Sequence, residues 1–122
     1  MAAPNNYGAA LDFIVKEFGG TVEETDETVS VGTTVTDIVG NDPDAVALVL
    51  INLGATTVFV APTNTVATNK GIQLNANGGF MSLIVRDDLI LPANAWYGIA
   101  DTAASDVYVI RIRRLKTIKA LS

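Results

Sequence analysis

The chain of 122 residues contains no cysteine and no histidine. Without cysteine it can form no disulfide, and it has neither a thiolate nucleophile nor a thiolate metal ligand. Without histidine it lacks the commonest general base and the commonest metal-binding side chain. The sequence therefore predicts a protein that is not an enzyme, with no catalytic residues, no cofactor and no metal site.

Closely spaced carboxylates outside the acidic N-terminal third are few: Asp42 with Asp44, and Asp87 with Asp88. A calcium loop of the EF-hand kind needs more oxygen ligands and a closing glutamate, which neither pair has. Aspartates in loops commonly form turns by accepting hydrogen bonds from nearby backbone N–H groups. We expect turn residues at both places.

Long hydrophobic runs are also missing. The longest, Ala45–Ile51, is far shorter than the roughly 20 residues that a membrane-spanning helix needs. The first ten residues, MAAPNNYGAA, lack the basic and then apolar pattern of a secretory signal. These features predict a soluble protein that is made and folded in the cytoplasm and does not enter a membrane.

Charge is scarce and unevenly distributed. Charged residues make up 17% of the chain, against roughly 25% in typical soluble domains, and hydrophobic residues make up 49%. This balance favours a homo-oligomer that covers apolar surface by association. The net charge is −5, yet the two signs are separated along the chain. Carboxylates dominate the charged residues before residue 45, and every charged residue after residue 106 is basic. Such polarity predicts complementary contacts, either within the chain or between neighbouring copies.

The N-terminal 28 residues are predicted to form an arm. Its apolar residues Leu11, Ile14, Val15 and Phe18 recur at helical spacing and place one apolar face on a short helix, which Gly19-Gly20 ends. A helix this short is marginal alone, so it should dock on its own domain or on a neighbouring subunit. Residues 21–28 are acidic and threonine-rich, which indicates a solvated linker or an edge strand protected by charge.

Residues 29–115 have the pattern of a β domain. Val29 to Asp37 alternate as one half-buried strand would, and the segments Ala45–Leu53 and Thr57–Ala61 predict a hairpin with Asn52–Thr56 as its turn. Further strands are expected at 71–74, 80–86, 95–101 and 106–113, with a brief additional pairing at 89–91. Seven to eight short strands with turns every 8 to 12 residues predict an all-β fold, an antiparallel β-sandwich or jelly-roll-like barrel with a short N-terminal helix. Residues 116–122 are predicted to form a basic tail.

Basic residues gather in the last strand and the tail. Alternation places Arg111 and Arg113 on one face, opposite the isoleucines, and Arg114 follows directly. This positive patch favours an acidic protein surface as partner, while the thirteen acids of the chain disfavour nucleic acid. Together with the arm, the predicted protein-interface residues are Leu11, Ile14, Val15, Phe18, Arg111, Arg113, Arg114, Lys116 and Lys119.

Two adjacent aromatic residues, Trp96 and Tyr97, should face opposite sides of a strand. One is expected in the core and the other at a surface or subunit interface. An exposed ring of this kind can also stack on a sugar, which gives carbohydrate binding as an alternative function.

Several turn and strand segments share one order along the chain: NLGATTVFV at 52–60, GIQL at 71–74, NGG at 77–79, WYGIA at 96–100 and DVYVIRI at 106–112. In this respect the run from Val46 to Arg113 resembles small β-sandwich domains of structural proteins in tailed bacteriophages. The resemblance does not extend to the N-terminal helix or the basic tail.

The resemblance implies a virion component that binds other virion proteins. The role that it favours is a capsid decoration, or cement, protein on the capsid surface, a homotrimer that binds and stabilises the shell of major capsid protein. Alternatives are a head–tail connector, a tail or fibre-associated protein, or a carbohydrate-binding module on a fibre. The family has no catalytic residues to carry over.

Overall fold

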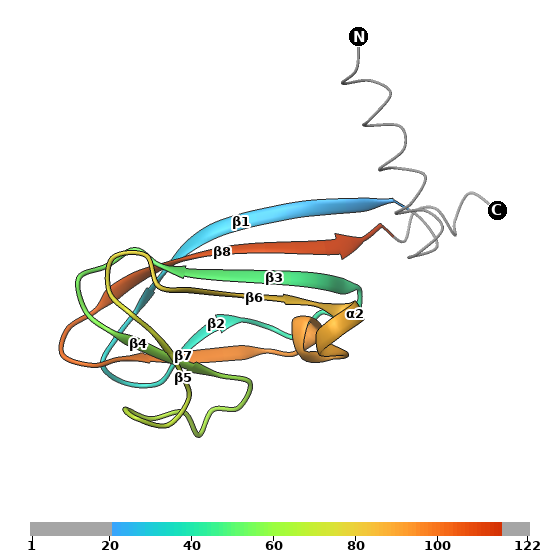
Figure 1. The fold of residues 1–122 in the computed structure, drawn as a ribbon. Helices are drawn as coiled ribbons and strands as arrows, with labels where there is room; N and C mark the ends of the chain where they lie inside the picture. Colours follow the sequence, from blue (N-terminus) through green and yellow to red (C-terminus); the bar gives the residue numbers. More distant parts are fainter. Residues whose placement is uncertain (1–20, 116–122) are drawn as a thin grey trace, which may run out of the picture.

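The computed structural model describes residues 21–115, which form two antiparallel four-stranded sheets packed face to face (Figure 1). Sheet A has the strand order β1 (Val22–Val31), β8 (Ser105–Arg114), β3 (Ala45–Asn52) and β6 (Phe80–Ile84). Sheet B has the order β2 (Thr36–Val39), β7 (Trp96–Ala100), β4 (Val58–Ala61) and β5 (Ile72–Leu74). The prediction of an all-β antiparallel sandwich is confirmed. The predicted N-terminal helix and basic tail lie outside the described residues.

The core forms where the two sheets face each other. Leu48 and Leu50 of sheet A and Val58 and Val60 of sheet B have no exposed surface. Trp96 is 1% exposed, and its Nε1 donates a hydrogen bond of 2.9 Å to the carbonyl oxygen of Leu91. Trp96 is thus the core member of the aromatic pair. It has no surface on which a sugar could stack.

The predicted hairpin between β3 and β4 is wrong. β3 pairs with β8 and β6 in sheet A, whereas β4 pairs with β7 and β5 in sheet B, so residues 53–57 cross between the sheets. β3 and β4 lie in opposite sheets, and each contributes side chains to the core between them. Their five-residue connection lacks the Asn-Gly or Asp-Gly signal of a tight hairpin.

Asn52 holds this crossover at its start. Its side chain is fully buried, and Nδ2 donates to the carbonyl oxygens of Thr56 at 2.8 Å and Leu74 at 3.0 Å. Its Oδ1 accepts from the Gly54 N–H at 3.1 Å and from Ser105 Oγ at 2.7 Å. We call these five residues the Asn52 cluster. One neutral side chain thereby links both sheets and the crossover.

The predicted single strand from Val29 to Asp37 is also wrong. β1 ends at Val31, the chain bends, and β2 begins at Thr36 in the opposite sheet. Thr36 Oγ1 fixes the bend by accepting a hydrogen bond from the Gly32 N–H at 3.1 Å and donating one to the Thr34 carbonyl at 2.9 Å. The alternation changes phase at the bend, because β1 buries Val31 whereas β2 buries Ile38 and leaves Asp37 exposed.

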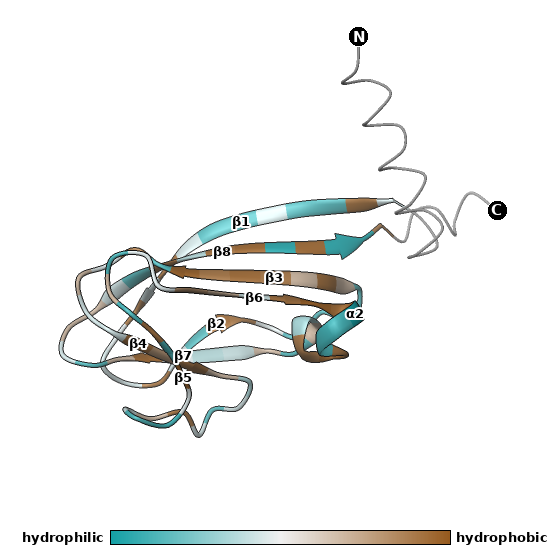
Figure 2. Ribbon diagram, in the orientation of Figure 1, coloured by the Kyte–Doolittle hydropathy of each residue, from teal (hydrophilic) through white to brown (hydrophobic). Residues whose placement is uncertain are grey.

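The acidic segment forms an edge strand, one of its two predicted structures. β1 pairs with β8 along its whole length from Val22 to Val31, so the predicted boundary between arm and domain at residue 29 falls inside a strand. Figure 2 shows the contrast within sheet A, where β3 is hydrophobic along most of its length and β1 is largely hydrophilic. Acidic side chains on an edge strand disfavour pairing with a further strand.

The strand predicted to reach Arg86 ends earlier. β6 stops at Ile84, and the chain continues as a short helix, α2 (Val85–Asp88), and a 3-10 turn, η1 (Leu91–Ala93). The backbone N–H of Ile84 donates to Asp88 Oδ2 at 2.9 Å, which closes the helical turn in place of strand pairing. The brief pairing expected at 89–91 is therefore wrong.

Candidate protein-interaction surfaces

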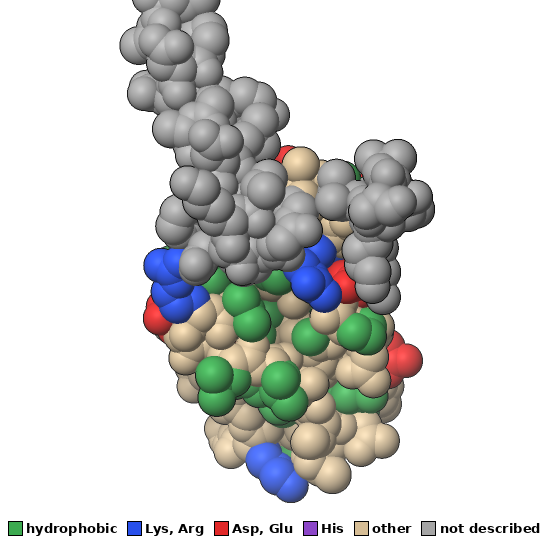
Figure 3. Space-filling model, turned by 90° about the vertical axis from the view of Figure 1, so that its right-hand side faces the viewer, with side chains coloured by type: hydrophobic (Ala, Val, Ile, Leu, Met, Phe, Trp, Pro, Cys, Tyr) green, Lys and Arg blue, Asp and Glu red, His purple; other side chains and the backbone are tan. Residues whose placement is uncertain are grey.

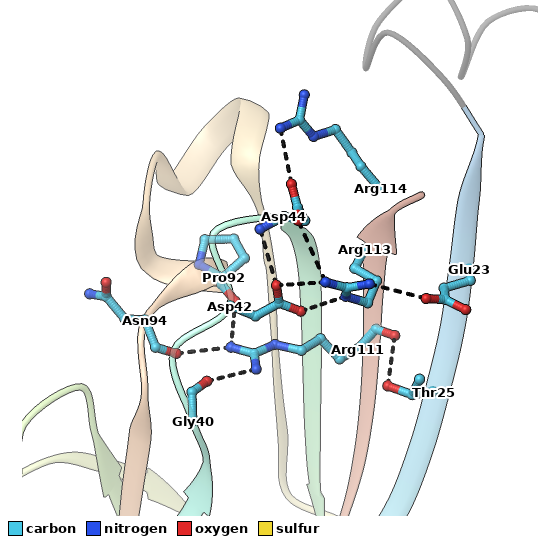
Figure 4. Close-up of polar contacts among 10 residues, drawn as sticks. All are labelled: Glu23, Thr25, Gly40, Asp42, Asp44, Pro92, Asn94, Arg111, Arg113 and Arg114. Carbon is cyan, nitrogen blue, oxygen red and sulfur yellow. Dashed lines mark hydrogen bonds and ion pairs between the residues drawn. The ribbon is translucent and has the colours of Figure 1, made fainter. Parts of the chain in front are cut away.

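Arg111 lies inside the sandwich and not on a positive surface patch. It is 8% exposed because it shares the inward face of β8 with Val107 and Val109. Its guanidinium donates to three backbone carbonyl oxygens: those of Gly40 at 2.7 Å, Asn94 at 3.0 Å and Pro92 at 3.1 Å (Figure 4). Burial lowers the pKa of Arg111, and the charge of Asp42 opposes this effect. Arg111 thus ties β8 to the segment that follows β2 and the segment that precedes β7, two neighbouring strands of sheet B.

Arg113 meets the acidic half of the chain. Its Nε and Nη2 bind the two carboxylate oxygens of Asp42 at 2.8 and 3.2 Å, and its Nη1 lies 3.2 Å from Glu23 Oε1 (Figure 4). Asp44 Oδ2 lies 3.5 Å from Arg113, and Asp44 Oδ1 lies 3.2 Å from Arg114 Nη2. We call these five residues the charged cluster. The predicted attraction between the acidic and basic ends is therefore made within one chain.

The charged cluster shifts ionisation in both directions. The hydrogen bonds from Arg113 lower the pKa of Asp42 below its ordinary value of 3.8, although partial burial acts against them. The same contact, together with Glu23, raises the pKa of Arg113. Asp42 also forms the predicted turn, because its Oδ1 accepts the backbone N–H of Asp44 at 3.1 Å. Its carboxylate is thus already engaged by protein donors.

A pocket of about 350 Å³ opens beside the charged cluster, between β1, β2 and β8. Carboxylates and guanidinium groups line it together, including Asp26, Glu27, Asp42, Arg111 and Arg113. Among residues 21–115, no group of three acidic side chains is arranged to hold a metal ion. The mixed charge of the pocket gives no preference for an anion or a cation.

The most exposed apolar side chains belong to the turn between α2 and η1. Leu89 is 72% exposed and Ile90 is 70% exposed. Their backbone angles, φ 57° and ψ −120° for Leu89 and φ −85° and ψ −6° for Ile90, match the central residues of a type II′ turn. The first central position of such a turn favours glycine, so leucine there is strained by about 1–3 kcal/mol. Figure 3 shows hydrophobic side chains gathered at this end of the sandwich.

A second apolar surface is the outer face of sheet A. The strand registers set its central residues in three rows across β8, β3 and β6: Tyr108, Ile51 and Phe80; Ile110, Val49 and Ser82; and Ile112, Ala47 and Ile84. Phe80 is 67% exposed and Ile84 is 42% exposed, while the apolar residues of β8 and β3 are half-buried. Within residues 21–115, the two helical turns lie at one end of the sandwich and leave this face uncovered (Figure 1).

The sequence-based interface prediction overlaps little with these surfaces. Arg111 and Arg113 are engaged within the fold, and Arg114 contacts Asp44. The remaining predicted residues, Leu11, Ile14, Val15, Phe18, Lys116 and Lys119, lie outside the described part of the chain. Sequence reasoning missed Leu89 and Ile90 as surface residues. A usable signal was present, because this apolar pair lies between Asp87-Asp88 and Pro92, a turn-like context.

No family model and no curated protein matches the sequence. One similar solved structure is a pilus of Bacillus endospore appendages described as disulfide-linked, with a TM-score of 0.49, 16% identity, and coverage of 77% of this chain and 86% of that chain. Another is a Bacillus halodurans protein, with a TM-score of 0.39, 14% identity, and coverage of 77% and 64% respectively. In the described residues, no helix is long and apolar enough to cross a membrane.

Proposed function

We propose that the protein is a non-enzymatic structural subunit of a tailed-bacteriophage virion, a capsid decoration protein that binds and stabilises the shell of major capsid protein. The observation that carries this proposal is the turn at Leu89 and Ile90. Two neighbouring aliphatic side chains project into solvent, where they add nothing to the core. Contiguous exposed apolar groups of this kind mark protein-binding surfaces.

The strained backbone supports the same function. Glycine at position 89 would remove the strain, so the leucine side chain has a cost to folding that a contact with a partner can offset. Leu89 and Ile90 are well suited to fill an apolar depression on the shell. The Arg113 ion pairs hold β8 against the loop at 40–44 and so stabilise the same end of the sandwich.

Binding to capsids tests the proposal. Wild-type protein should co-sediment with capsids built from the major capsid protein of the same virus. Leu89→Gly should weaken binding about tenfold, the effect expected when one apolar side chain leaves the centre of a contact. The same substitution should leave the thermal midpoint unchanged or raise it, because it relieves the turn.

Leu53→Ser is the matched control, since Leu53 is also an exposed leucine at 53% but belongs to the crossover between the sheets. It should bind capsids as the wild type does. Wild-type protein that fails to co-sediment overturns the capsid role, and Leu89→Gly protein that binds with unchanged affinity overturns the role of the turn.

A further inference from the structure

The outer face of sheet A lacks a cover within residues 21–115, although most of its central residues are apolar. β3 is the source of this property, because its outward residues Ala47, Val49 and Ile51 are as hydrophobic as its inward ones. A strand that is apolar on both faces is typical of a sheet covered on both sides. The inward side is covered by sheet B, so the outward side needs a second layer.

We propose that residues 9–18 of the same chain form the amphipathic helix that their sequence predicts and pack it over the outer face of sheet A. The sequence leaves two docking sites open for this helix, the chain's own domain and a neighbouring subunit. Sheet A is the first of these. The apolar side chains Leu11, Ile14, Val15 and Phe18 would contact the apolar rows on β8 and β3. This inference does not depend on the capsid role.

The point of attachment favours this placement. Val22, the first residue of β1, pairs with Arg114, and the register places both on the outward side next to Ile112. Only Gly19, Gly20 and Thr21 separate Val22 from Phe18, a connection that reaches about 13 Å when extended. The strands β8 and β3 lie about 5 and 10 Å from β1 across the sheet, so Phe18 can reach both.

The dimensions also agree. A ten-residue helix is about 15 Å long. The three apolar rows, from Tyr108 to Ile112 along β8, span about 13 Å. A helix that runs antiparallel to β1 would place Leu11 over the row of Ile51 and Phe18 over the row of Ala47. Glycine at positions 19 and 20 permits the sharp reversal that this path needs.

Docking within the chain is favoured over exchange between copies. A three-residue connection holds the helix at a high effective concentration next to its own sheet. The helix of a second molecule would match that concentration only in a very concentrated protein solution. The arrangement adds a helix layer to the sandwich, a common way to bury a second apolar sheet face.

Disulfide trapping tests the proposal cleanly because the chain has no native cysteine. The full-length Ile14→Cys/Val49→Cys protein should form a disulfide within one chain under mild oxidation, at a yield independent of protein concentration. Ile14→Cys/Gln73→Cys is the matched control, since Gln73 is exposed on β5 in the other sheet. The control should give no disulfide within the chain.

A second pair, Leu11→Cys/Ile51→Cys, keeps the test decisive if the substitution at Val49 prevents folding, and it also probes the direction of the helix. Non-reducing electrophoresis and mass spectrometry distinguish the products. Disulfides that join two chains and increase with concentration would show that a second copy supplies the segment, which overturns the proposal. The absence of any disulfide in both folded pairs overturns it as well.

Discussion

Different chemical groups link the two sheets at the two ends of the sandwich. At one end the Asn52 cluster links the sheets through a neutral amide whose donor and acceptor groups are all satisfied. At the other end Arg111 and the charged cluster link them through guanidinium groups and carboxylates. The comparison indicates that stability at the Asn52 end is insensitive to pH, whereas stability at the charged end depends on ionisation.

The largest loss is expected at the neutral end. Asn52→Ala removes the amide and leaves the buried Leu74 carbonyl, Gly54 N–H and Ser105 hydroxyl without this partner. Each such group costs about 1–3 kcal/mol, so the free energy of unfolding should fall by about 3 kcal/mol or more. Urea denaturation at pH 7 and pH 5 should give the same loss. A loss that differs between the two pH values contradicts the neutral character of this end.

A smaller loss is expected for Arg111→Met, about 2 kcal/mol in urea denaturation. The substitution removes charge-assisted hydrogen bonds to three carbonyl groups, but it also removes the cost of burying a charge. Arg111→Lys should recover little of this lost stability. One ammonium group cannot reproduce the hydrogen bonds that the forked guanidinium group directs at Gly40, Pro92 and Asn94. Full stability in the lysine variant would show that charge alone matters here.

The smallest effect concerns pH and Asp42. Because folding lowers the pKa of Asp42, its carboxylate stabilises the fold above the ordinary value of 3.8. That contribution disappears as pH falls from 3.8 through the lower folded-state pKa. Asp42→Asn should reduce stability at pH 7 by less than about 1 kcal/mol and flatten its decline in acid.

Thermal unfolding measured between pH 7 and pH 2 checks this prediction. The control is Asp101→Asn, since Asp101 is an exposed loop residue. It should retain the acid dependence of the wild type. An Asp42→Asn protein whose stability declines as steeply as the wild type would place the titrating contact elsewhere.

The fold class was predictable because strand alternation and turn composition are local properties of the sequence. The partners of each strand were not, since β3 and β4 follow one another yet lie in different sheets. Turn composition shows where a chain reverses but not whether it stays in the same layer. The bend after Val31 escaped prediction for the same reason.

The candidate surfaces were only partly predictable. Alternation correctly placed Arg111 and Arg113 on one face of β8, but the charge of Arg111 suggested the solvent side. Its neighbours Val107 and Val109 on that face indicated the interior, and carbonyl groups contributed by distant segments make its burial possible. Those carbonyl positions depend on tertiary structure, which the sequence pattern does not contain.

The acidic edge strand has a consequence for self-association. The row of carboxylates on β1 keeps a second molecule from adding a strand to sheet A at neutral pH. Exchanging the exposed carboxylates Glu24 and Asp26 for neutral amides would remove this repulsion and leave the outer backbone edge of β1 open to a further strand. The sandwich should still fold, but it should gain a route to edge-to-edge fibre growth, so the charge on β1 contributes to solubility and not only to the contact with Arg113.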